Sequence, residues 1–252
     1  MTGSFLANLL FSSAVLSVAV ALGGILPIFF HGIRKHLPLF LSCSAGIMLG
    51  ATLLHLLPEA VHLIGPRASW WLLLGFLFLY LFERFVTVHI CEALDCEVHT
   101  MGIAAVVGIS AHALTDGVAL GAGLLLSKVG WVVLITIFFH KLPEAFALTS
   151  ILLHETKRRF HILLMNLVLI LMVPLGGFLL YYFMRTPQAQ STGAALAFSA
   201  GTFLHIAISD LLPEVHKFSD RRYALLASFF AGLALMFLLG SLIHPMGSEV
   251  HP

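Results

Sequence analysis

Apolar stretches long enough to cross a lipid bilayer follow one another along almost the whole chain. A spanning helix needs about 20 predominantly apolar residues. Eight stretches meet this requirement, at residues 5–30, 38–63, 69–89, 101–126, 130–153, 162–184, 192–215 and 223–244. Only 10% of the residues are charged, against about 25% in soluble domains. The sequence therefore predicts an all-α integral membrane protein with a single membrane domain over residues 1–252, and it excludes nucleic-acid binding and cytosolic catalysis.

The positions of Lys and Arg predict how these stretches are oriented. Most of the 13 basic residues lie in the odd-numbered connections or beside them, including Arg34, Lys35 and the run Lys157–Arg159. Cytoplasmic loops of membrane proteins are enriched in Lys and Arg. We therefore expect the odd-numbered connections in the cytoplasm and both termini on the extracytoplasmic side.

A short internal repeat relates the second stretch to the seventh. The segment Ala45–Glu59 aligns with Ala200–Glu214, and both segments begin with Ala-Gly and end with Leu-Leu-Pro-Glu. The charge distribution predicts that these two stretches cross the membrane in opposite directions. Similar sequences in antiparallel helices are typical of the inverted repeats of transporters.

Eight ionisable residues inside the apolar stretches share one spacing. They form four pairs separated by four residues: His55/Glu59, His112/Asp116, His140/Glu144 and Asp210/Glu214. This spacing places both members of a pair on one helix face. A charge near the bilayer centre costs at least about 2.5–3.5 kcal/mol, so such residues are expected to have a function or a partner. Because imidazole and carboxylate groups are zinc ligands, the two central pairs are predicted to converge as a four-ligand site.

Proline residues accompany three of the four pairs. Pro143 has no N–H group to donate, so it frees the carbonyl of Phe139 four residues earlier. Pro58 and Pro213 have the same effect beside the outer pairs. Kinked helices with freed carbonyls are expected around an ion site in the middle of a membrane.

With these motifs, the chain resembles the ZIP (Zrt/Irt-like) family of divalent metal transporters. Residues 112–117 are similar to the family's fourth-helix motif His-Asn-x-x-Glu/Asp-Gly, and Pro143-Glu144 is similar to its fifth-helix Pro-Glu motif. The resemblance implies eight transmembrane helices in a 3+2+3 inverted-repeat bundle, import toward the cytoplasm across the cell membrane, and compatibility with a homodimer. It implies four metal ligands: His112, Asp116, His140 and Glu144. For the location we expect the cell membrane, or an organelle membrane if the source is eukaryotic.

Three positions depart from the family pattern. Many relatives hold a second metal through side chains at the places that are occupied here by Ala113, Lys141 and Val173. None of these three can supply the expected ligand. We therefore predict a single-metal site in which the ammonium group of Lys141 takes the place of the second cation.

Other polar residues are accessory candidates. We expect a pathway or accessory role for six residues: His55, Glu59, Lys141, His205, Asp210 and Glu214. For Lys141 the alternative is a snorkelling lysine that only pairs with Glu144 or Asp210. For the other residues the alternative is hydrogen bonds that join helices, or in the case of His205 a hydrogen bond to a neighbouring carbonyl. The connection that holds His89, Cys91, Cys96 and His99 is either a metal-receiving site or a solvated loop.

Zinc is the favoured substrate because two nitrogen and two carboxylate ligands suit it, with Cd²⁺, Fe²⁺, Mn²⁺ and Co²⁺ as alternatives. The expected partners are the metal ion and the lipid bilayer. The competing function is an intramembrane metal-dependent hydrolase, in which the same ligands would activate water. Against it, the sequence has no His-Glu-x-x-His motif. A passive cation channel is a third alternative.

Overall fold

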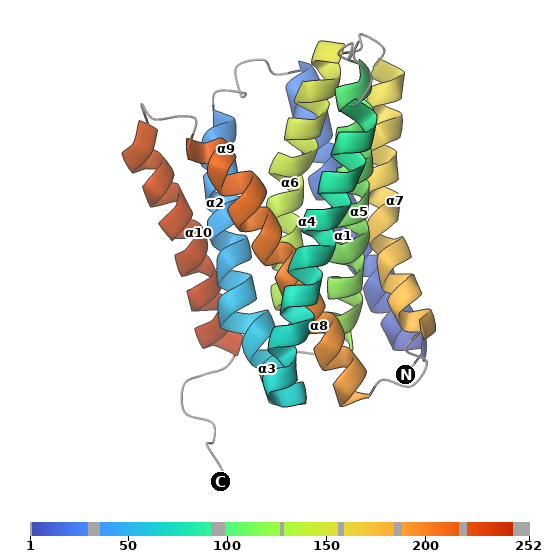
Figure 1. The fold of residues 1–252 in the computed structure, drawn as a ribbon, viewed down its shortest axis with the longest axis vertical. Coiled ribbons are helices and arrows are strands. Elements are labelled where there is room, and N and C mark those ends of the chain that lie inside the picture. Colours follow the sequence, from blue (N-terminus) through green and yellow to red (C-terminus); the bar gives the residue numbers. More distant parts are fainter. Residues whose placement is uncertain are drawn as a thin grey trace.

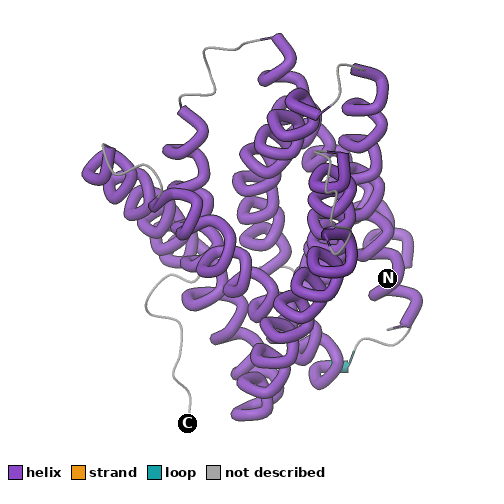
Figure 2. Tube along the Cα trace, turned by 45° about the horizontal axis from the view of Figure 1, so that its top comes forward, coloured by secondary structure: helices purple, strands orange, loops and turns teal. Residues whose placement is uncertain are grey.

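The computed structural model describes residues 2–29, 36–91, 99–126, 129–155, 159–183, 188–216 and 221–243. Within these ranges the chain is helical apart from short turns (Figures 1 and 2). The six uninterrupted long helices of these ranges are α1 (Thr2–Phe29), α4 (Ala68–Cys91), α5 (His99–Leu124), α6 (Val129–Glu155), α7 (Arg159–Phe183) and α10 (Arg222–Ile243). The all-helical prediction is therefore confirmed for the described residues.

Two further helices each contain a π-helical segment. Helix α2 (Leu37–Ala51) continues through η2 (Thr52–Leu56) into α3 (Leu57–Ile64). Helix α8 (Ala189–His205) continues through η4 (Ile206–Leu211) into α9 (Leu212–His216). Both π-helical segments lie in the repeated sequence, next to Pro58 and Pro213. Because a proline removes a backbone donor, the helix beside each of these prolines changes locally to the wider π-helical hydrogen-bond pattern.

Seven helical stretches in the described part of the chain are long and apolar enough to cross a membrane. The longest of them, Leu37–Phe85, contains 49 residues, which as one straight helix would measure about 70 Å against a hydrocarbon core of about 30 Å. This stretch bends back on itself. Gly65, between α3 and the 3-10 turn η3 (Gly65–Arg67), has a φ of 62°, and α4 returns toward the other end of the bundle (Figure 1).

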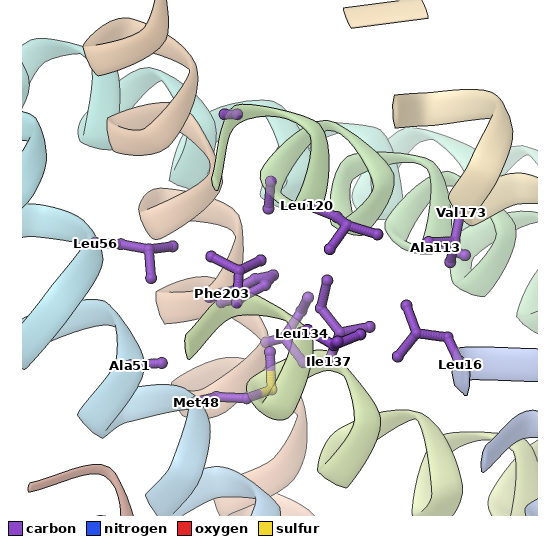
Figure 3. Packing of buried hydrophobic residues seen from close by; sticks show 14 of the residues in the cluster. Leu16, Met48, Ala51, Leu56, Ala113, Leu120, Leu134, Ile137, Val173 and Phe203 are labelled. Carbon is purple, nitrogen blue, oxygen red and sulfur yellow. The ribbon is translucent and has the colours of Figure 1, made fainter. Parts of the chain in front are cut away.

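Apolar side chains fill the interior and also cover the outside of the bundle. Leu16, Met48, Ile137 and Phe203 belong to one buried cluster between the helices (Figure 3). Many large apolar residues are exposed, among them Leu10, Phe11, Trp70, Phe178 and Phe237. A surface of this kind is stable against lipid and would aggregate in water. The fold is that of a multi-pass helical membrane protein.

Glycines bring certain helices into backbone contact. Gly46 on α2 abuts the Phe229 carbonyl of α10, and its repeat counterpart, Gly201 on α8, abuts the Leu72 carbonyl of α4. A Cβ atom at either glycine would clash with that carbonyl oxygen. Small residues allow this close packing of membrane helices. The two repeated segments therefore pack in the same way, each against one outer helix.

Candidate metal site

Two neighbouring helices supply the polar side chains at the centre of the bundle. His112 and Asp116 come from α5, and His140 and Glu144 come from α6. Each residue offers a ligand atom, and these atoms all lie within 4.8 Å of one another. The structure thus brings together the four residues that the sequence singled out.

The distances within this group suit a tetrahedral cation. The Nε2 atom of His140 lies 3.3 Å from Oδ2 of Asp116, and the Nε2 atom of His112 lies 3.4 Å from the same oxygen. His112 Nε2 is 4.0 Å from Oε2 of Glu144. Around Zn²⁺, with bonds of about 2.0–2.1 Å, tetrahedral ligand atoms are about 3.3 Å apart. Two of the three separations match that spacing.

The hydrogen bond of His140 to the backbone determines which ring nitrogen faces the site. Its Nδ1 atom lies 2.8 Å from the Thr136 carbonyl oxygen. A carbonyl oxygen can only accept, so Nδ1 carries the proton. In the neutral ring, Nε2 then presents its lone pair toward the Asp116 carboxylate. A cation between the two atoms satisfies both, and such a backbone contact is the usual way to orient a metal-binding histidine.

Several polar atoms of the group have no hydrogen-bond partner among the described residues. They are His112 Nδ1, His112 Nε2, Asp116 Oδ1 and Glu144 Oε1. The side chain of Asp116 is fully buried, and those of His112 and Glu144 are exposed by 7% and 13%. An unsatisfied buried polar atom costs about 1–3 kcal/mol, and more when it is charged. The group therefore fits a metal ion better than it fits a closed hydrogen-bond network.

Lys141 places a fixed positive charge next to the same carboxylates. Its Nζ atom lies 2.8 Å from Asp116 Oδ2 and 2.5 Å from Glu144 Oε2, and its side chain has no exposed surface. Ala113 and Val173, the other two positions that depart from the family pattern, are also buried. The ammonium group therefore bridges two carboxylates of the group.

Neighbouring helices hold the α6 part of the site. The hydroxyl of Ser44, on α2, donates a hydrogen bond of 3.1 Å to the Phe139 carbonyl, the group that Pro143 leaves without its helical donor. The ring of Phe203, on α8, contacts the His140 ring edge-on, with centroids 5.6 Å apart. Helix α6 stays continuous through Pro143, and the His140 ring is packed against Phe203.

The remaining candidates lie apart from these four residues. The Nε2 atom of His55 donates a hydrogen bond of 2.9 Å to the Met236 carbonyl of α10. Glu59, on α3, is half-buried and belongs to neither metal-ligand group found among the described residues. His205 and Asp210 join Glu83 in a second group. The side chains of Glu214 and of the His89, Cys91, Cys96 and His99 set lie outside the described part of the structure.

Glu83 is the residue of these groups that the sequence reasoning missed. It lies in α4, and its Oε2 atom is 2.9 Å from His205 Nε2. It was overlooked because no His or acidic residue stands four positions from it. Its position inside an apolar stretch is itself a signal, since an ionisable residue there calls for a partner.

The fold and this site define a class: multi-pass helical membrane proteins with a buried metal-ligand group between two helices. Comparison with known proteins specifies the family. Residues 91–240 match the family model described as ZIP zinc transporter. Zinc transporter ZIP9-B of Xenopus laevis is 31% identical, with 81% of this chain and 85% of that protein aligned. The chain belongs to the ZIP family of zinc transporters, which favours transport over the hydrolase alternative.

Other relatives agree with this assignment. Zinc transporter ZIP9 of Micropogonias undulatus is 30% identical, again with 81% of this chain and 85% of that protein aligned. Zinc transporter ZIP4 of Homo sapiens is 32% identical over a shorter region, 46% of this chain and 18% of that protein. The two ZIP9 relatives thus align with most of this chain, and ZIP4 aligns with somewhat less than half of it.

Proposed function

We propose that this protein carries Zn²⁺ across the membrane into the cytoplasm through one binding site between α5 and α6. The observation that carries the proposal is the spacing of the four ligand atoms, with Asp116 Oδ2 3.3 and 3.4 Å from the two histidine nitrogens. In this proposal His112, Asp116, His140 and Glu144 replace the hydration shell of the ion. Their two carboxylates compensate its charge in a medium of low dielectric constant.

The proposed topology has eight crossings. The 49-residue stretch Leu37–Phe85 crosses twice, with its turn at Gly65. The basic residues place the odd-numbered connections in the cytoplasm and both termini outside. Helices α1–α4 and α7–α10 then form the two inverted halves, with α5 and α6 between them, as in a 3+2+3 bundle. The close packing of α2 with α10 and of α8 with α4 supports this relation.

A cavity of ≈ 510 Å³ provides the proposed entrance for the ion. It is lined by residues of α4, α5 and the beginning of α8, including Trp71, Val118 and Ala195. Gln188 and Ser191 contribute polar groups to its lining. In the proposed orientation this is the extracytoplasmic side, because α8 begins there.

We propose that the ammonium group of Lys141 is a fixed positive charge that pairs with the two carboxylates when no metal ion is bound. Its contacts with Asp116 and Glu144 neutralise part of the charge that would otherwise be buried without a counter-ion. The same positive charge weakens zinc binding, and a transport site must release its ion. One lysine charge thus replaces a second metal ion. The homodimer and the choice of the cell membrane stay predictions from the family resemblance.

Uptake into proteoliposomes tests the proposal. The parent protein should accumulate Zn²⁺ with a saturable rate, whereas His140→Ala should lose most of this uptake. The control is His161→Ala, since His161 is exposed at the start of α7. Parallel assays with Cd²⁺, Fe²⁺, Mn²⁺ and Co²⁺ establish the selectivity. Equal uptake by the parent and His140→Ala would refute the site, and a rate that never saturates would favour a channel.

A further inference from the structure

The four-ligand group of α5 and α6, here called the central site, receives a ring contact from a helix that carries none of its ligands. The ring of Phe203, on α8, lies edge-on to the imidazole of His140, with ring centroids 5.6 Å apart and planes inclined by 72°. Phe203 has no exposed surface and belongs to the buried cluster between the helices (Figure 3). Aromatic rings in this arrangement attract each other beyond the burial of their surfaces, so the contact favours one relative orientation.

The orientation of the His140 imidazole depends on this ring and on one hydrogen bond. The hydrogen bond joins Nδ1 to the Thr136 carbonyl oxygen, 2.8 Å away. It restrains one atom of the imidazole, and the ring can still tilt about that atom. The Phe203 ring against its flank limits this tilt. With both contacts in place, Nε2 lies 3.3 Å from Asp116 Oδ2, which is the geometry that zinc binding needs.

His112, the other imidazole of the central site, lacks comparable support. Neither of its nitrogens has a hydrogen-bond partner among the described residues. Its ring lies beside the His140 ring, with centroids 5.4 Å apart. His140 is therefore the ligand whose orientation is determined by the surrounding protein, and a metal site is only as precise as the residues that support its ligands.

The Phe203 ring spans the distance between two helices that are otherwise apart. Among the described residues, the backbones of α6 and α8 come close at hardly any point. Helix α8 is fixed on its other side, because Gly201, two residues before Phe203, lies directly against the Leu72 carbonyl of α4. The place of the ring is therefore determined by the packing of α8 on α4 and not by α6.

The first half of the bundle indicates that the repeated segment does not require an aromatic residue here. The repeat counterpart of Phe203 is Met48 on α2, which is also fully buried and belongs to the same cluster. The same helical segment thus packs with a flexible thioether side chain in one half and with a flat ring in the other. The flat ring is the one that contacts a metal ligand.

We propose that Phe203 is a positioning residue for the central site: its ring holds the His140 imidazole with Nε2 toward the metal, so that the zinc affinity of ligands on α5 and α6 depends on the place of α8. The inference rests on the proposed zinc binding by these ligands and adds a requirement from outside them. A displacement of α8 from α6 would free the imidazole and lower the affinity, and a transport site needs such a change to release its ion.

Equilibrium dialysis of the purified full-length protein with Zn²⁺ tests this proposal. The quantity compared is the zinc binding that His140→Ala abolishes. Phe203→Leu keeps a buried apolar side chain but removes the ring, and it should raise the dissociation constant about three- to tenfold, as expected for the loss of one aromatic contact. The matched control is Phe5→Leu, since Phe5 is also buried and stacks on Tyr181, 4.7 Å away, with the parent's zinc affinity expected. Equal affinities of the two variants would overturn the proposal.

X-ray absorption of the bound zinc separates positioning from general packing. At less than one zinc ion per protein, the parent should show two imidazole ligands, and Phe203→Leu should show a weakened contribution from one of them. If the ring only fills space, the variant would have a lower unfolding temperature and the parent's spectrum, which refutes the positioning role.

Phe203→Met decides the question if Phe203→Leu does not fold, because the first half already accommodates Met at the equivalent place. This variant should also raise the dissociation constant, and an affinity equal to the parent's or tighter would overturn the proposal. Failure of the proposed function has a different signature. In that case the parent would bind no zinc, or His140→Ala would bind it as tightly as the parent.

Discussion

The side-chain ammonium of Lys141 lies 2.8 Å from the Oδ2 atom of Asp116, and neither side chain has exposed surface. The same oxygen is the atom that both histidines of the site approach. An entering cation therefore competes with a charge that belongs to the protein. This competition has a measurable consequence for affinity and for turnover.

Replacing Lys141 by Met should tighten zinc binding and slow transport. The variant keeps the length of the side chain but removes a positive charge that repels the ion in a medium of low dielectric constant. We expect the dissociation constant of the central site to fall at least about tenfold, which is ~1.4 kcal/mol. Dialysis measures the affinity, and uptake at saturating zinc measures the turnover. Weaker binding in Lys141→Met would mean that the lysine supports the ligands more than it repels the ion.

Replacing Gly117 by Ala should destabilise the protein. A Cβ atom at this position would clash with the Val173 carbonyl of α7, so α5 would have to move away from its neighbour. Overpacking of this kind costs about 1–3 kcal/mol. Gly108→Ala is the control on the same helix, since a Cβ atom there meets nothing within 4 Å. Thermal unfolding in detergent compares the two variants, and equal unfolding temperatures would contradict the close contact.

Replacing Ser44 by Ala should weaken the support of α6 at Pro143. The Phe139 carbonyl would lose the donor that replaces the missing proline N–H group. This hydrogen bond is partly buried, so its loss should cost about 0.5–1.5 kcal/mol. Ser17→Ala is the control, because Ser17 bonds only a carbonyl of its own helix among the contacts seen here. The unfolding temperature should fall in Ser44→Ala alone, and an unchanged value would contradict the support of α6 by Ser44.

Replacing Ala195 by Trp should block the entrance without altering the site. The indole would occupy the cavity lined by Trp71 and Val118, so uptake should fall severalfold. Zinc binding at equilibrium should remain, because the four ligands are untouched. Ala231→Trp serves as the control, since Ala231 is exposed on α10. Normal uptake by Ala195→Trp would place the entrance elsewhere.

The spacing of residues along the sequence predicted much of this structure. Contacts between segments that are distant in the sequence could not be predicted from this spacing. The apolar stretches anticipated the helices, because a membrane demands long apolar segments whatever their neighbours are. The four-residue spacing placed His112 beside Asp116, because both lie on one helix. The contact of His55 with Met236 depends on how the helix that holds His55 packs against α10. The partner of Glu83 is His205 on another helix, so the sequence around Glu83 does not reveal it.

The glycine contacts limit how the molecule can move. Where Gly46 meets Phe229, Gly201 meets Leu72 and Gly117 meets Val173, one backbone lies directly against another. Helices packed in this way cannot slide past each other without first separating, so each pair is expected to move as one rigid unit. The proposed metal site lies on α5 and α6, and α5 is held to α7 in this way. For the proposed transport function we therefore expect these helix pairs to move as rigid units against one another when the site opens to one side and then to the other.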